Sequence, residues 1–85
     1  MIFLGWSSVD PAEELGEGPW REVFRLAPGL FLFDSEASLS RVYHELKWSL
    51  PPGASVLVAP LHEAPKFLRL EHGARAWLRD RQLDR

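Results

Sequence analysis

The predicted fold is decided by residues 30–60, which read LFLFDSEASLSRVYHELKWSLPPGASVLVAP. The first four positions, Leu30–Phe33, are apolar without a break, as in a strand that is buried on both faces. A helix is predicted to open at Asp34 or Ser35, because large apolar residues then recur along one side at helical spacing. These apolar positions are Leu39, Val42, Tyr43, Leu46 and Leu50.

Pro51 ends this predicted helix, because a proline disfavours the α conformation of the residue before it. Pro52 and Gly53 complete the stop, and the Val56–Val58 run that follows predicts another strand. A strand, a helix and a strand of these lengths form a crossover unit, in which the two strands run parallel to each other.

Further elements are predicted on both sides of this unit. Ile2–Trp6 is a short apolar run that predicts a buried strand, and Asp10–Pro19 predicts a short helix or a loop. Pro28-Gly29, at the centre of residues 27–30, predicts a type II turn that joins two strands of a hairpin within residues 20–33. Phe67–Leu70 is predicted as an edge strand, and residues 73–85 as a helix that becomes basic in its last turns.

The order of these elements predicts a single α+β domain over residues 1–85. Strand, short helix, strand, strand, helix and strand is the order of a ferredoxin-like sandwich, here with a C-terminal helical appendage. We expect the helices to cover one face of the sheet. The other face would then need a cover, and a second copy of the same chain is the common solution. The sequence therefore predicts a homodimer.

Composition excludes several classes of function. The chain has 85 residues, a formal net charge of -2 and no cysteine, so it holds no disulfide, no thiolate zinc site and no cysteine nucleophile. Threonine and asparagine are absent, a depletion that is typical of heat-adapted proteins and predicts a thermophilic origin. The apolar start, Met1–Trp6, is too short to span a bilayer, so we expect no membrane association and a cytoplasmic location.

The side chains that carry chemistry are dispersed. His44, His62 and His72 lack the spacing of a metal site, and no serine lies in a nucleophile-elbow pattern. The carboxylates around Asp10 could bind a divalent cation, or they could form a solvated acidic first turn of a helix. These carboxylates are Asp10, Glu13 and Glu14. The sequence predicts no catalytic residue, no metal site and no cofactor.

Two groups of residues are candidates for contact with partners. Arg41, His44 and Trp48 lie on the side of the predicted helix opposite its apolar stripe, where they could form a partner surface, or the Trp48 ring could fold down over a neighbouring segment. The second group is basic, because residues 66–85 hold six bases and three acids, whereas residues 1–20 hold four acids and no base. The candidates for nucleic-acid contact are Arg69, Arg75, Arg79 and Arg81. They could equally pair with the acidic segment.

Three stretches resemble the second half of the small CRISPR-associated adaptation nucleases and their VapD-like relatives. These stretches are residues 29–34, 38–50 and 54–61, and residues 73–78 are similar to the end of some members. The resemblance implies a ferredoxin-like homodimer with nucleic acid as partner. It implies no catalytic residue here, since those nucleases place an aspartate at the end of the first strand, whereas this strand ends in Trp6-Ser7-Ser8.

These observations predict a small non-catalytic module that forms homodimers. The alternative is a nucleic-acid-binding relative of those nucleases, with a lost or altered catalytic site.

Overall fold

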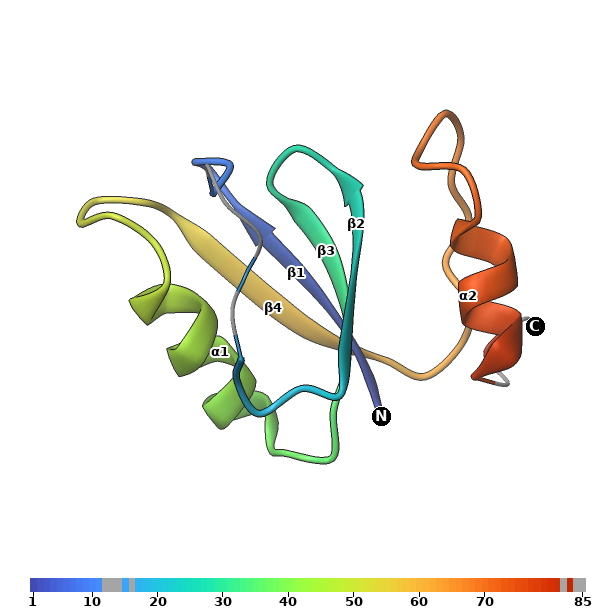
Figure 1. The fold of residues 1–85 in the computed structure, drawn as a ribbon, viewed down its shortest axis with the longest axis horizontal. Helices are drawn as coiled ribbons and strands as arrows, with labels where there is room; N and C mark the ends of the chain where they lie inside the picture. Colours follow the sequence, from blue (N-terminus) through green and yellow to red (C-terminus); the bar gives the residue numbers. More distant parts are fainter. Residues whose placement is uncertain (12–14, 16, 82, 84–85) are drawn as a thin grey trace.

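The computed structural model describes residues 1–11, 15, 17–81 and 83. An antiparallel sheet of four strands, in the order β2-β3-β1-β4, is joined by two helices (Figure 1). The strands are β1 (Ile2–Ser7), β2 (Glu22–Ala27), β3 (Leu30–Asp34) and β4 (Val56–Leu61). The helices are α1 (Leu39–Trp48) and α2 (Ala74–Asp80). The α+β class predicted from the sequence is confirmed.

The order of the strands follows from the local signals in the sequence. β2 and β3 form the predicted hairpin, and Gly29 has φ +74°, the left-handed conformation that a type II turn requires at this position. β1 pairs antiparallel with β3 on one side and with β4 on the other. β3 and β4 therefore point the same way, as the crossover unit requires, with β1 between them.

One face of the sheet packs against α1. The side chains of Phe3, Phe31 and Phe33 pack there against Val42 and Leu46 of the helix, and each of the five is at most 4% exposed. β1 approaches α1 closely because position 5 is a glycine. A Cβ atom at Gly5 would lie 2.5 Å from Cε2 of Phe33, which is itself fully buried.

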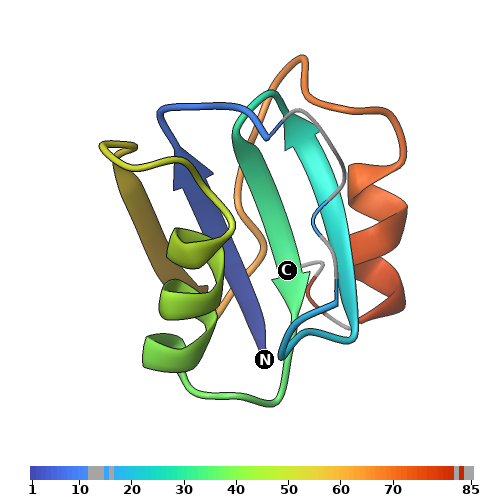
Figure 2. The same cartoon turned by 60° about the vertical axis from the view of Figure 1, so that its left-hand side comes forward.

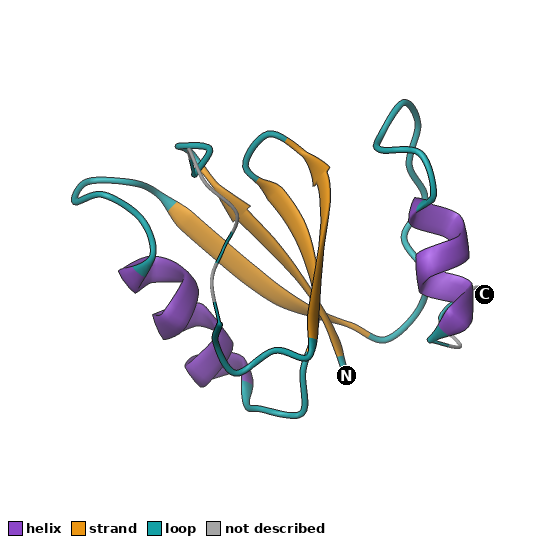
Figure 3. Cartoon of the chain, in the orientation of Figure 1, coloured by secondary structure: helices purple, strands orange, loops and turns teal. Residues whose placement is uncertain are grey.

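The opposite face packs against α2, so the two described helices cover different faces of the sheet (Figures 2 and 3). The sequence predicted that the short helix within Asp10–Pro19 and the long helix share one face and that a second copy covers the other, whereas α2 covers part of that other face. Ala74 and Leu78 of α2 form a core with Ile2, Leu26 and Leu32 of the sheet. A second copy is therefore not needed to cover this end of the face, because the C-terminal appendage covers it.

One boundary and one further element also differ from the prediction. α1 begins after Ser38, whose Oγ accepts a hydrogen bond from the Arg41 amide at 3.2 Å, so the cap lies three residues beyond Ser35. Ser35 is instead buried and donates its hydroxyl proton to the Pro19 carbonyl. Residues 67–70 form no strand, because Phe67 and Leu70 turn inward to pack on the α2 core.

Most of the short helix predicted within Asp10–Pro19 falls on positions 12–14 and 16, which lie outside the described residues. Neither α1 nor α2 has the length and apolar character needed to cross a membrane, and no other described segment is such a helix.

Candidate interaction surface

β4 is an edge strand of the sheet. None of its six residues is buried, whereas β3 has three buried residues and β1 has four. β4 also carries no charge, because residues 48–61 contain no Asp, Glu, Lys, Arg or His. An uncharged edge strand with free backbone groups is a template for pairing with another strand.

The direction of the backbone groups along β4 follows from one hydrogen bond. Ser8 donates its amide proton to the Ser55 carbonyl at 2.9 Å, just beyond the paired residues of β1 and β4. Because hydrogen-bonded pairs alternate along an antiparallel ladder, Leu57, Ala59 and Leu61 face β1 with their amide and carbonyl groups. The amide and carbonyl groups of Val56 and Val58 therefore point away from the sheet. The backbone nitrogen of Pro60 also points away from β1, so the proline removes no hydrogen bond from the ladder between β1 and β4.

Two large apolar side chains border this edge. Trp6 and Leu57 lie opposite each other in the β1–β4 register and are 42% and 54% exposed. They are on the same face as Ile2 and Leu32, but α2 packs over the β2 side of that face. We call Trp6, Leu57 and the outward backbone of Val56 and Val58 the β4 edge surface.

The other edge of the sheet, β2, is protected against pairing. Glu22 and Arg25 are exposed and charged, and the register with β3 shifts between Arg25 and Ala27. The Leu26 carbonyl accepts a hydrogen bond from the Glu71 amide at 2.9 Å, so a loop occupies part of this edge. Charges, a bulge and a covering segment are the common devices that block strand addition, and β2 has all three.

The candidate residues on α1 lie together on its outer side. The rings of His44 and Trp48 are 5.7 Å apart, and Trp48 is 69% exposed, so its ring does not fold under a described segment. The Nδ1 atom of His44 is 2.7 Å from the Ser40 carbonyl. Since a carbonyl can only accept, Nδ1 carries the proton and Nε2 is left as the acceptor of the neutral ring. Arg41 is exposed one turn earlier.

The candidate residues of the basic segment are not equivalent. Arg69, Arg75 and Arg79 are exposed, and the guanidinium of Arg75 lies 4.7 Å from the centre of the Phe67 ring. The Arg81 side chain is only 16% exposed and is already paired with carboxylates of the same chain. Arg81 is therefore paired within the chain, but with Asp34 and Glu22 rather than with the acidic segment of residues 1–20. Arg69, Arg75 and Arg79 are exposed to solvent.

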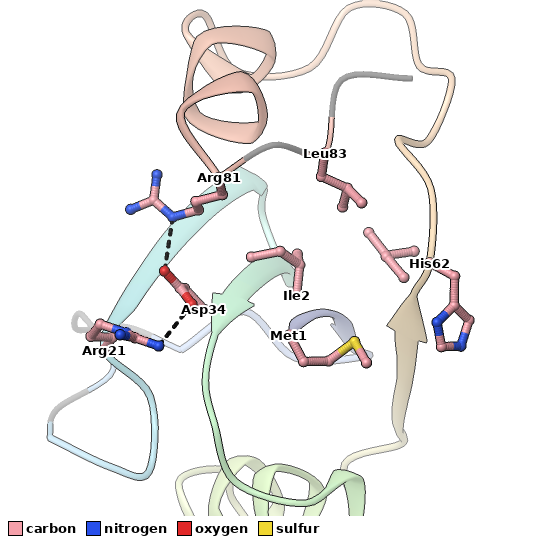
Figure 4. A pocket seen from close by; sticks show the side chains of 8 residues that line it. Met1, Ile2, Arg21, Asp34, His62, Arg81 and Leu83 are labelled. Atoms are coloured by element: carbon pink, nitrogen blue, oxygen red, sulfur yellow. Dashed lines mark hydrogen bonds and ion pairs between the residues drawn. The ribbon is translucent and has the colours of Figure 1, made fainter.

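Arg81 fastens the end of α2 to the sheet (Figure 4). Its Nε donates to Oδ2 of Asp34 at 3.1 Å, and a second nitrogen contacts Glu22. The guanidinium also lies 3.7 Å from the centre of the Trp77 ring, a cation–π geometry. Burial, and then the nearby positive charge of Arg21, lower the pKa of Arg81 from its ordinary value.

An open cavity of about 460 Å³ lies beside this ion pair. Its walls are apolar at Met1, Leu61 and Leu83 and polar at Asp34 and His62. The two arginines among its described lining residues, Arg21 and Arg81, are paired with Asp34, Glu22 and Glu36.

Both carboxylate oxygens of Asp10 have partners within the chain. Its Oδ1 accepts a hydrogen bond from the Gly29 amide at 2.7 Å, and its Oδ2 pairs with the Arg25 guanidinium. Glu13 and Glu14 lie outside the described residues, and the described part of the chain contains no cluster of three or more potential metal ligands.

Comparison with known proteins adds no relative: no protein-family model, curated sequence or solved structure matched this chain. The functional assignment therefore rests on the geometry above. Sequence reasoning missed Trp6 and Leu57, although the uncharged run of residues 48–61 was a signal for an exposed edge.

Proposed function

We propose that the chain is a small, non-catalytic interaction module that acts as a homodimer. The observation that carries this proposal is the β4 edge surface, which is open, uncharged and bordered by Trp6 and Leu57. A chain of 85 residues buries a smaller fraction of its surface than a larger domain, so burying this edge adds appreciably to its stability.

We also propose that the fold is a variant of the ferredoxin-like sandwich. Two features support this: the antiparallel order β2-β3-β1-β4, and a helix that connects β3 to β4. α2 on the second face would be the departure from that architecture.

Light scattering on a sizing column tests the homodimer. We expect a mass near twice the 9.7 kDa of the chain at high micromolar concentration, falling toward one chain on dilution. Leu57→Lys should shift the protein to monomer, because it places a charge on the edge, whereas Leu68→Lys should not, although Leu68 is 73% exposed. A monomer at every concentration would overturn the proposal.

A second candidate function is nucleic-acid binding by a relative of the CRISPR-associated and VapD-like proteins with a lost or altered catalytic site. It is supported by Arg75 and Arg79, which are exposed one turn apart on α2. Binding of labelled RNA and duplex DNA at low salt tests this candidate, since the electrostatic contribution is largest there. The double substitution Arg75→Ala/Arg79→Ala should weaken binding far more than Arg41→Ala/Lys47→Ala, which removes the same charge from α1. Undetectable binding would exclude this function.

A further inference from the structure

We infer that two copies of the chain pair β4 to β4, antiparallel, around a two-fold axis that passes beside Leu57. The four strands of each copy would then form one continuous sheet. This inference rests on the proposed homodimer and specifies which surfaces meet and in which register.

The backbone directions select the register. Val56 and Val58 present outward amide and carbonyl groups, so an antiparallel copy can pair Val56 with Val58 of the second copy and Val58 with Val56 of the second copy. If one strand shifts by one residue relative to the other, the outward backbone groups of one copy face residues of the second copy whose backbone groups point inward, and no ladder of hydrogen bonds forms. A shift that centres the pairing on Val58 sets Val56 opposite Pro60 of the second copy, which has no amide proton to donate.

The side chains select the same register. With Val56 opposite Val58, each Leu57 lies directly opposite the Leu57 of the second copy, at a position without backbone hydrogen bonds, where side chains approach most closely. Leu57 is 54% exposed, so placing it against its counterpart shields apolar surface from water. Centring on Val58 would instead place Leu57 opposite Ala59 of the second copy, which buries less apolar surface.

The charge distribution selects a second copy as the occupant. A residue on a two-fold axis meets its own counterpart, so a charge there would meet a like charge. Residues 48–61 form an uncharged stretch that includes all of β4. β2, the opposite edge, carries the exposed charges Glu22 and Arg25 and is partly covered by the loop at Glu71.

The size of the interface sets its strength. A strand of six residues spans about 20 Å, and a standard interface takes about 800 Å² from each partner. A single edge strand with the Leu57 side chain is a small contact against that standard. We therefore expect a dimer that dissociates at micromolar concentrations.

A disulfide test reads the register directly, because the chain contains no cysteine of its own. Residues opposite each other without backbone hydrogen bonds have Cα atoms about 4.5 Å apart, within the range that a disulfide spans. Under mild oxidation, we expect Leu57→Cys to give at least about ten times more cross-linked dimer than Leu68→Cys, which reports random collision, or Ala59→Cys, which lies off the axis.

The outcomes separate the two proposals. The register would be overturned if Ala59→Cys cross-links efficiently and Leu57→Cys does not. It would also be overturned if Leu57→Cys and Leu68→Cys cross-link equally. If light scattering shows a dimer and Leu57→Cys does not cross-link, another surface holds the two copies together and this inference falls, whereas the proposed function stands. A monomeric protein overturns both.

A proline variant provides an independent reading. Val58→Pro removes an outward amide proton and leaves the ladder with β1 intact, as Pro60 already does two residues later. We expect this variant to keep its far-ultraviolet circular dichroism spectrum and to lose dimerisation by at least about tenfold. A folded Val58→Pro protein that dimerises as well as the unmodified chain would overturn the inference.

Discussion

Arg81 at the end of α2 donates a hydrogen bond from Nε to Oδ2 of Asp34 at the end of β3, across 47 positions of the chain. Both side chains are 16% exposed, so the pair is screened less by water than a surface ion pair. Glu22 and the Trp77 ring complete the surroundings of the guanidinium. The contact holds a helix of only seven residues against the sheet.

Arg81→Ala should therefore lower the free energy of unfolding by about 1–3 kcal/mol, between the values typical of exposed and buried pairs. Urea denaturation measures this change, and hydrogen exchange should show faster exchange in α2. Arg79→Ala is the matched control, because Arg79 is an exposed arginine of the same helix that pairs with no carboxylate of the described residues. Equal effects of the two substitutions would contradict a fastening role for Arg81.

Leu78→Ala tests how strongly the packing of α2 against the sheet stabilises the protein. Leu78 is 2% exposed, so its truncation should cost about 2–5 kcal/mol through lost burial and a cavity. Leu68→Ala changes a leucine that is 73% exposed and should stay within about 0.5 kcal/mol of the unmodified chain. The stabilities of all variants must be measured at the same protein concentration, because dimerisation adds to the apparent stability. A small effect of Leu78→Ala would mean that α2 is only loosely attached.

Gly5→Ala tests the close approach of β1 to α1. The added methyl group would lie 2.5 Å from Cε2 of Phe33 and 3.2 Å from Cδ2 of Leu46, so we expect a loss of about 1–3 kcal/mol from overpacking. Phe33→Leu makes room at the first contact. In a double-mutant cycle, Gly5→Ala/Phe33→Leu should therefore cost less than the sum of the single changes. Simple additivity would show that the cost arises elsewhere.

Asp10→Ala tests the contact between the segment after β1 and the hairpin. It leaves the buried Gly29 amide without its side-chain acceptor and frees Arg25, so we expect a loss of about 1–3 kcal/mol. Glu17→Ala, at an exposed carboxylate of the same segment, should have little effect. Thermal unfolding compares the two variants. Unchanged stability in Asp10→Ala would reopen a chemical role for this carboxylate, which a phosphodiesterase assay with added divalent metal ions would then measure.

Local patterns in the sequence were sufficient for most of the elements. The apolar stripe of α1, with Val42 and Leu46 fully buried, and the left-handed Gly29 in the hairpin turn are properties of a few neighbouring residues. For the same reason, the uninterrupted apolar run of Phe31, Leu32 and Phe33 correctly predicted a strand that is buried on both faces.

The position of α2 could not be predicted in this way. Its stripe of Ala74, Trp77 and Leu78 shows that one side of the helix is buried, but it does not show against which face of the sheet. The sequence predicted that a helix opens at Asp34 or Ser35, whereas Asp34 is the last residue of β3 and its partner, Arg81, is remote in sequence. Nothing in an arginine's immediate neighbours indicates which carboxylate it will meet.

α2 follows all four strands along the chain, which affects how the protein folds during its synthesis. While a ribosome is still adding α2, the sheet can already form and pack against α1, but Ile2, Leu26 and Leu32 remain in contact with water. Exposed apolar surface of this kind makes a nascent chain prone to aggregation and to capture by chaperones. Emergence of the last helix from the ribosome is therefore the step that ends this vulnerable interval.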